Sequence, residues 1–364
     1  MKLKELVGFL ENMVPLSMQE SYDNCGLIVG DKNQEITGVL VALDCIESIV
    51  DEAIQKKCNV IVAHHPIVFK GLKSLVGKNY IERTVLKSIK NDIAIYAIHT
   101  NLDNYRWGVN FEIGNRIGLK NLQILAPKDH VLQKLAFFVP NDQLSEVRNA
   151  LFELGAGGIG NYDQCSFNSE GEGTFRALKG ANPFVGKQGE LHREKETRVE
   201  IIVSSHQINV VVNKLCEVHP YEEVAYDIYP LANVNFHEGA GMVGELPEAM
   251  DEKAFLEKIK TTFKCGVIRH TALRNKKIQK VAFCGGSGIF LLPFAKRAKA
   301  DIYITADVKY HEFFDAENDI LLADIGHYES EQFTIDLLCD ILIKKFTTFA
   351  VHLTKMNTNP INYL

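Results

Sequence analysis

The sequence predicts an α/β fold in which two α/β lobes of similar style flank a small ferredoxin-like α+β domain. Three observations support this prediction. Short apolar segments alternate with amphipathic helical segments in the first third of the 364 residues, and the same style returns in the last third. The middle third has a different order of elements and contains a long glycine-rich stretch. A chain of this length can bury two or three separate cores.

The first third begins with a helical stripe formed by Leu3, Leu6, Val7 and Leu10. The elements expected after it are a strand over 37–44, a helix over 46–58, a strand over 59–63, a helix over 79–91 and a strand over 93–98. The expected strands are apolar almost throughout. Such strands, when separated by helices, indicate a sheet that is covered on both faces.

The last third repeats this alternation. Its expected elements are a strand over 280–284, a turn over 285–288, a helix over 289–300, strands over 301–305 and 320–325, and a long helix over 330–346. The middle reads instead as strand–helix, a polar glycine-rich stretch over 155–191, and then strand–helix–strand, which suits a ferredoxin-like unit with a long hairpin. We therefore expect a first lobe over 1–127, an inserted domain over 128–232 and a second lobe over 233–364.

The composition narrows the classes of function and location. A formal net charge of −6 gives no basic footprint for nucleic acid. No apolar run approaches the roughly 20 residues that span a bilayer, and the first residues lack the apolar core of a signal peptide. The eight cysteines are scattered and form no C-x-x-C pair, which favours reduced thiols over disulfides or a zinc-thiolate site. We expect a cytoplasmic protein with no membrane partner.

Polar clusters follow three of the expected strands. His64 and His65 follow the strand over 59–63, His99 and Asp103 follow the strand over 93–98, and His327 and Glu331 follow the strand over 320–325. The carboxyl ends of strands form the ligand crevice of open α/β sheets, so all three clusters can lie on one rim. A lone histidine at a strand end is more often a capping or packing residue, but three such clusters favour a shared ligand.

Imidazole and carboxylate together suit a divalent transition metal such as zinc, iron, manganese or nickel. His327 and Glu331 are four residues apart, so a helix that begins there presents both on one face, and Glu329 projects elsewhere. His64 and His65 converge only if the strand has already ended, and otherwise they serve two different ions. Five candidate ligands exceed the needs of one open catalytic zinc, whereas two ions bridged by Glu331 use all five.

Other residues near these clusters each allow more than one role. His99 is a sixth ligand, a residue that orients another ligand, or a proton shuttle. Lys70 and Lys73 are candidates for contact with a substrate phosphate, although solvated lysines are commoner. The segment "CGGSG" at 284–288 is either a phosphate cradle or, more often for so short a pattern, a tight structural turn.

Several uncommon motifs occur in an order that resembles one known family. They are "SYDNCGLIVG" (21–30), "AHHPIVFKGLKSL" (63–75), "AIHTNLDN" (97–104), "CSFNSEGEGTF" (165–175), "GANPFVGKQGEL" (180–191), "HPYEEVAYDIYPL" (219–231), "CGGSG" (284–288) and "IGHYESEQ" (325–332). With them the chain resembles the GTP cyclohydrolase I type 2 homologue family, also called the Nif-three-like proteins, over nearly its whole length. One departure is Tyr105, Arg106 and Trp107, where many relatives carry small residues; it could reshape the cavity.

The resemblance implies two related α/β lobes that form one metal-binding unit around a dinuclear centre, with an inserted domain like the PII and CutA proteins. It implies that the metal ligands are His64, His65, Asp103, His327 and Glu331. It also implies a homohexamer that acts on a nucleotide by metal-assisted hydrolysis, opening the purine ring of GTP. Two alternatives stay open: a metal-dependent regulatory or interaction protein whose inserted domain senses a ligand, and a nucleotide phosphoesterase.

Overall fold

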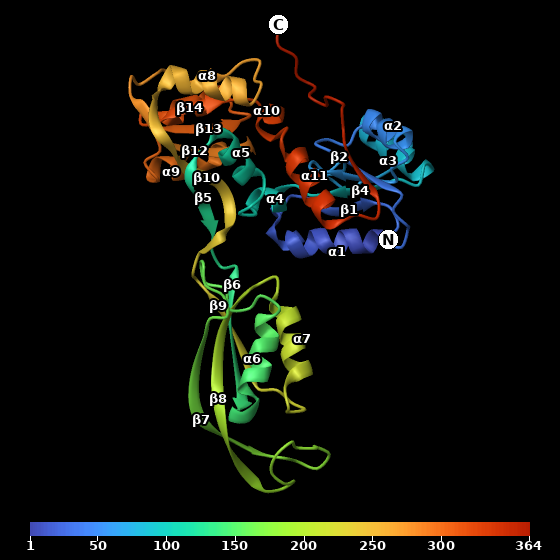
Figure 1. Cartoon of the computed structure of the whole chain (residues 1–364), viewed down its shortest axis with the longest axis vertical. Coiled ribbons are helices and arrows are strands. Elements are labelled where there is room, and N and C mark those ends of the chain that lie inside the picture. Colours follow the sequence, from blue (N-terminus) through green and yellow to red (C-terminus); the bar gives the residue numbers. More distant parts are fainter. The chain divides into compact units, whose positions relative to one another are not determined.

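The computed structural model describes residues 1–364, which form two compact units. The outer unit consists of Met1–Ala126 and His237–Leu364, and the inserted unit consists of Pro127–Phe236. Figure 1 shows that the outer unit contains two sheets and the inserted unit contains one.

The first sheet of the outer unit has five strands in the order β1-β4-β3-β2-β15. Their bounds are Gly26–Val29 (β1), Gly38–Ala42 (β2), Val60–Ala63 (β3), Ala94–Ala97 (β4) and Ala350–Leu353 (β15). Strands β15, β2, β3 and β4 run parallel to their neighbours, and β1 pairs with β4 in antiparallel fashion. Every residue of β2, β3 and β4 is buried, as the apolar segments predicted.

Both faces of this sheet are covered, which explains why its strands are apolar throughout. Because side chains alternate along a strand, Val39 and Val41 pack in one cluster, with residues of α1 (Leu3–Met13) and α11 (Thr334–Lys345). Leu40 and Ala42 pack in another, with residues of α2 (Glu47–Gln55) and α3 (Tyr80–Lys90). The predicted helices over 46–58 and 79–91 thus cover one face together.

The second sheet of the outer unit has six strands in the order β11-β14-β13-β12-β10-β5. Their bounds are Lys120–Lys128 (β5), Asn235–Asp251 (β10), Arg269–His270 (β11), Lys277–Ser287 (β12), Ile302–Ala306 (β13) and Leu321–Asp324 (β14). Strands β12, β13 and β14 are parallel. Helices α5 (Val109–Ile117) and α8 (Glu252–Thr262) share one cluster with this sheet, and α9 (Leu292–Arg297) belongs to another.

The two sheets take strands from distant parts of the chain. Strand β15, close to the C-terminus, completes the first sheet beside β2. Strand β5 comes from the first third and joins the second sheet, which is otherwise built from the last third. One hydrophobic cluster contains buried residues of both sheets, such as Val62 and Ile304. The two sheets therefore share one core.

Several elements differ in detail from their predicted ranges. The predicted helix over 289–300 is a 3-10 turn, Ile289–Leu291, followed by α9. The predicted helix over 330–346 is two helices, α10 (His327–Glu331) and α11. The first three residues of the predicted turn over 285–288 are instead the end of β12, which shifts register between Phe283 and Ser287. The shift bends the strand where glycines 285 and 286 approach α10.

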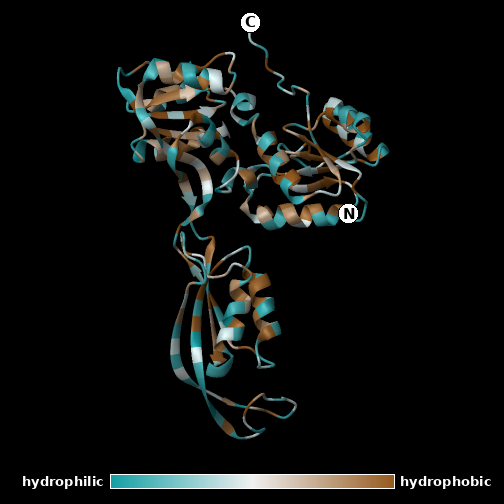
Figure 2. Cartoon of the chain, viewed as in Figure 1, coloured by the Kyte–Doolittle hydropathy of each residue, from teal (hydrophilic) through white to brown (hydrophobic).

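The inserted unit is a four-stranded antiparallel sheet with two helices. Its elements in chain order are β6 (Leu132–Pro140), α6 (Leu144–Phe152), β7 (Ser166–Arg176), β8 (Leu191–Ser204), α7 (Ile208–Val218) and β9 (Tyr226–Leu231). The sheet order is β7-β8-β6-β9. Its own core contains Phe137 and Val199, which are register partners, together with Val147 of α6 and Val211 of α7. Figure 2 shows both hydrophobic and hydrophilic colour on each of these helices.

None of the helices in the chain is both long enough and apolar enough to cross a membrane.

Candidate metal centre

The six site residues predicted from the three strand ends come together in the outer unit. His64 and His65 follow β3 directly, and His99 precedes α4 (Thr100–Asn104), which carries Asp103. The remaining two residues stand at either end of α10, which follows β14. The rings of His64 and His65 lie 4.9 Å apart at an angle of 45°. They converge because β3 has ended at Ala63.

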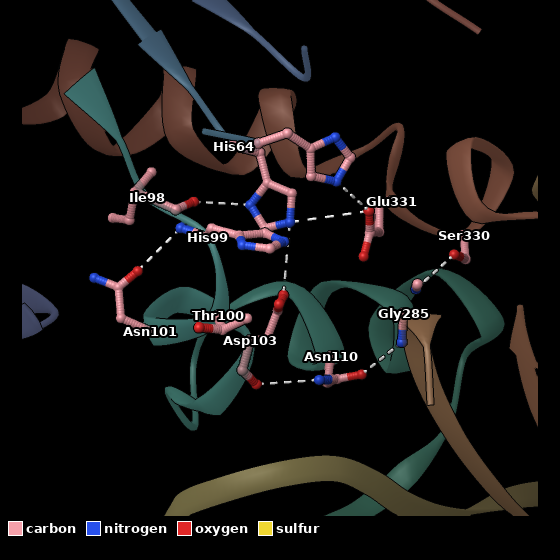
Figure 3. A network of polar contacts seen from close by, with 12 residues as sticks. His64, Ile98, His99, Thr100, Asn101, Asp103, Asn110, Gly285, Ser330 and Glu331 are labelled. Carbon is pink, nitrogen blue, oxygen red and sulfur yellow. Dashed lines mark hydrogen bonds and ion pairs between the residues drawn. The ribbon is translucent and has the colours of Figure 1, made fainter. Parts of the chain in front are cut away.

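One oxygen of Glu331 lies close to three imidazoles. Its Oε2 atom is 2.9 Å from Nε2 of His65, 3.1 Å from Nε2 of His327 and 3.9 Å from Nε2 of His64. Figure 3 shows the Glu331 side chain pointing toward His64. The side chain of Glu331 is only 2% exposed. The i,i+4 spacing on α10 therefore places His327 and Glu331 on one face, as predicted.

In each of the four histidines, Nδ1 lies within hydrogen-bond distance of an oxygen atom that is not itself a candidate ligand. Nδ1 of His65 lies 2.8 Å from Asp44, Nδ1 of His99 lies 2.9 Å from Asp23, and Nδ1 of His327 lies 2.7 Å from Asp307. Nδ1 of His64 lies 2.8 Å from the carbonyl oxygen of Ile98. An acceptor at Nδ1 keeps the proton there in a neutral imidazole, so that Nε2 is free to bind a metal. All four rings present Nε2 inward.

Two buried atoms in this group have no hydrogen-bond partner. They are Nε2 of His64 and Oδ1 of Asp103, which lie 3.7 Å apart. Leaving such atoms unpaired costs about 1–3 kcal/mol each. Two ligands that share one ion at about 2.1 Å each lie roughly 3–4 Å apart, so the pair has the spacing of a metal site. Figure 3 shows both side chains directed toward the same region.

The charge states of the group depend on one another. Complete burial lowers the pKa of His64 to about 3, so its ring is neutral. Burial also opposes protonation of His65 and His327. The hydrogen bond to Asp44 and the charge of Glu331 outweigh burial at His65 and raise its pKa to about 9. The charge of Glu331 and the hydrogen bond to Asp307 do the same at His327 and raise its pKa to about 11. In the absence of a metal cation, the positive charges of protonated His65 and His327 compensate the negative charge of the buried Glu331 carboxylate.

The two carboxylates of the group differ in their acidity. Burial, together with the negative charge of Glu331, raises the pKa of Asp103 well above its usual value. Burial opposes ionisation of Glu331 as well, but the charge and hydrogen bonds of His327 and His65 hold its pKa well below the usual value. A cation in the centre would favour the ionised form of both.

Two glycines of the segment 284–288 leave space for the side chain of Glu331 because they have no side chains of their own. A Cβ on Gly286, whose φ is +62°, would lie 2.3 Å from Oε1 of Glu331. The amide of Gly285 donates to Asn110, and the amide of Gly286 donates to Ser330. These amides are thus occupied by side chains of the protein itself, which favours the structural interpretation of "CGGSG" over a phosphate cradle. Figure 3 shows the Asn110–Gly285 contact.

A cavity of about 1250 Å³ opens beside the histidines. His65, His99, Asp103, His327 and Glu331 all line it, and so does Lys70. Lys73 is exposed and is not among the lining residues. Neither Arg106 nor Trp107 lines it, so the departure at 105–107 does not shape its wall.

The C-terminal tail closes part of this cavity. The hydroxyl of Thr358 donates to Oδ2 of Asp44 at 2.5 Å, and the Asn359 amide donates to Glu329 at 3.1 Å. Glu329 therefore faces away from the histidines, as its position on α10 predicted. Residues 358–361 belong to the cavity lining.

Sequence reasoning missed the three aspartates that hold the histidines. Asp44 lies two residues after β2 and Asp307 directly after β13, so both obey the strand-end rule that found the histidines. Asp23 lies in the loop before β1, within the motif "SYDNCG", and has no such signal. The chain thus brings three groups together that could hold a metal ion: His64, His65 and His99; His65, His327 and Glu331; and His64, Asp103 and Glu331.

Comparison with protein families gives a match over almost the whole chain. The model of the Duf34/NIF3 (NGG1p interacting factor 3) family matches residues 1–360. A curated protein of Halalkalibacterium halodurans is 43% identical over 324 residues, which cover 88% of this chain and 87% of that protein. A protein of Bacillus subtilis is 37% identical and covers 99% of this chain and 98% of its own. Both bear the name "GTP cyclohydrolase 1 type 2 homolog".

Solved structures give the same result. The crystal structure of a Bacillus cereus protein related to NIF3 matches with a TM-score of 0.88 and 37% identity, over 100% of this chain and 99% of that one. A Staphylococcus aureus protein matches with a TM-score of 0.78 and 32% identity over the same shares.

Proposed function

The chain belongs to the Duf34/NIF3 (NGG1p interacting factor 3) family, and on that premise we propose that its outer unit is a dinuclear divalent-metal hydrolase of the GTP cyclohydrolase 1 type 2 kind. The proposed ligands are His64, His65, Asp103, His327 and Glu331, with Glu331 shared between two ions of zinc, iron, manganese or nickel. The observation that carries the proposal is the approach of three imidazole Nε2 atoms within 4 Å of one Glu331 oxygen. Glu331 belongs to two of the three possible ligand groups.

Bound divalent ions would lower the pKa of a water molecule and so provide a nucleophile near neutral pH. The side chains of the protein would orient the ligands and transfer protons in this reaction. Asp44 and Asp307 fix the rings of His65 and His327. His99 is our candidate for moving a proton, because Asp23 holds its Nδ1 and its ring lies 5.2 Å from that of His64.

The proposed substrate is a purine nucleotide whose imidazole ring is opened by hydrolysis. The cavity of about 1250 Å³ is large enough for such a molecule. Lys70 lines the cavity and is the better candidate for contact with a phosphate. Lys73 lies three residues further along the chain and is exposed, so it would act only on a phosphate that extends beyond the cavity.

The proposal extends to the organisation of the chain. We assign 1–127 and 233–364 to two related lobes and 128–232 to a ferredoxin-like domain of the PII and CutA type. The β-α-β-β-α-β order and the sheet order β7-β8-β6-β9 support the second assignment. From the family resemblance alone we also propose that the protein is cytoplasmic and forms a homohexamer. Light scattering on the purified protein tests the hexamer.

The test begins with protein that is stripped of metal and reloaded separately with zinc, iron(II), manganese or nickel. Elemental analysis should find two ions per chain. Each loaded form is then incubated with GTP while the guanine absorbance is followed. We expect turnover with at least one metal and its loss in His65→Ala. The matched control is His311→Ala, which removes an exposed histidine outside the cavity.

The alternatives give different results in the same experiment. Release of phosphate with an intact guanine absorbance would identify a phosphoesterase. Fully loaded protein that acts on no nucleotide would exclude the hydrolase proposal. Loss of thermal stability in His65→Ala would then favour a metal-dependent regulatory protein. One observation supports the regulatory protein as a second candidate: the inserted unit has a cavity of its own, with a volume of about 600 Å³.

A further inference from the structure

The inserted unit contains a cavity that shares no lining residue with the cavity beside the proposed metal centre. Its volume is about 600 Å³, within the range of sites for small molecules. The wall is formed by the end of β7, by residues 177–184 in the loop that follows, by residues 221–225 before β9, and by Phe138 of β6 and Glu196 of β8. The backbone amide of Asn182 donates to Glu222 at 2.9 Å and so ties the two loops together.

A buried carboxylate stands in this wall. Glu196 of β8 is 9% exposed and lines the cavity. The hydroxyl of Tyr221 donates to its Oε1 at 2.8 Å, and no lysine or arginine pairs with it. A Cβ on Gly173 would lie 2.0 Å from Oε2, so glycine at that position makes room for the carboxylate. Buried carboxylates are usually paired with a cation, and this one is not.

Aromatic rings stand around the carboxylate. The ring centroid of Tyr221 lies 6.2 Å from that of Phe175 and 6.2 Å from that of Phe184. His219 fixes this tyrosine, because its Nδ1 accepts from the Tyr221 amide at 3.1 Å while its Nε2 donates to the carbonyl oxygen of Phe138. Aromatic faces attract cations within about 6 Å of the ring centroid.

The rim of the cavity carries apolar side chains that nothing in the unit covers. Leu178 is 67% exposed and Phe184 is 54% exposed, although both line the cavity. The charged lining residues are three glutamates and one arginine, Arg176, which is itself exposed. The site thus combines excess negative charge, aromatic faces and an apolar rim.

We propose that this cavity binds a small organic cation, with its ammonium group between Glu196 and the three rings and its apolar part against the rim. A neutral molecule of the same shape would leave Glu196 buried without a cation. An anion would meet three carboxylates. The inference does not depend on the metal centre, so either can fail without the other.

The test compares choline with 3,3-dimethylbutan-1-ol, its uncharged isostere, in calorimetric titrations of the full-length protein. We expect choline to bind at least about tenfold more tightly than the isostere. Glu196→Gln, which keeps an acceptor for the Tyr221 hydroxyl, should reduce choline affinity about tenfold. Glu170→Gln, an exposed carboxylate on the same hairpin and outside the cavity, should leave it unchanged.

A second variant guards against misfolding. Phe184→Ala removes a ring that is 54% exposed, so the unit should fold, and choline affinity should fall about threefold or more. Equal binding of choline and its isostere would overturn the proposal. So would unchanged choline affinity in Glu196→Gln, or the absence of choline binding at concentrations up to about 50 mM.

Discussion

Nε2 of His65 lies 2.9 Å from Oε2 of Glu331, although 266 positions separate the two residues in the chain. His65 follows a strand of the first sheet and Glu331 ends a short helix that follows the second. The contact therefore joins the two sheets at one point. In the proposed function, Glu331 at this point is the ligand that two metal ions share.

Replacement of Glu331 by glutamine should remove the charge that both proposed ions share. We expect metal affinity to fall by roughly a hundredfold, because the loss of an orienting neighbour alone typically costs 10–100-fold. The measurement is metal content after dialysis against a metal buffer. Glu329→Gln is the matched control, since Glu329 is also buried on α10 but bonds to Asn359. An equal loss of metal in both variants would contradict the prediction.

Replacement of Asp307 by asparagine should weaken metal binding without removing a ligand. Asp307 accepts from Nδ1 of His327 at 2.7 Å. An asparagine amide can donate there instead, which would shift the proton to Nε2. We expect about a 10–100-fold loss of affinity with the fold retained. Unchanged metal affinity in competition with a chelator of known strength would show that this aspartate does not orient the ring.

Metal binding should release protons, and its apparent affinity should increase with pH. The pKa of His65 is raised to about 9 and that of His327 to about 11, so both rings are protonated at pH 8 in the metal-free protein. Both must become neutral to bind a metal. The apparent affinity should therefore rise steeply with pH up to about 9, where His65 gives up its proton, and less steeply from there to about pH 11, where His327 gives up its own.

Calorimetry at pH 8 in buffers of different ionisation enthalpy measures this release. We expect about two protons per loaded chain. If no protons are exchanged with the buffer when the metal binds, the two rings do not ligate the metal.

Replacement of Gly286 by alanine should displace Glu331. Its φ of +62° already disfavours a side chain, and the added Cβ would lie 2.3 Å from Oε1 of Glu331. We expect destabilisation by about 1–3 kcal/mol together with loss of metal. Gly71→Ala is the control, because a Cβ there meets nothing within 4 Å. Thermal unfolding with and without metal checks both expectations, and normal metal content in Gly286→Ala would contradict them.

The sequence was informative where a local rule applied. The apolar segments over 59–63 and 93–98 predicted buried strands, and the polar residues after them predicted one shared rim. The spacing of His327 and Glu331 predicted their common face because a helix repeats every 3.6 residues. The same strand-end rule, if applied to Asp44 and Asp307, would have found two of the three orienting carboxylates.

Long-range pairing had no local signal. Nothing within 350–353 specifies that β15 lies beside β2, since any short apolar edge strand could occupy that position. The break between α10 and α11 was missed because no glycine or proline marks it; the two residues between the helices are Gln332 and Phe333. Asp23 was missed because it lies in the loop before β1 and follows no strand, so the strand-end rule does not reach it.

Anomalous diffraction from crystals of zinc-loaded protein tests the central claim most directly. The account predicts two anomalous peaks beside Glu331, one in contact with His65 and His327 and the other with His64 and Asp103. No peak within bonding distance of Glu331, in crystals whose chains still carry zinc, would contradict it.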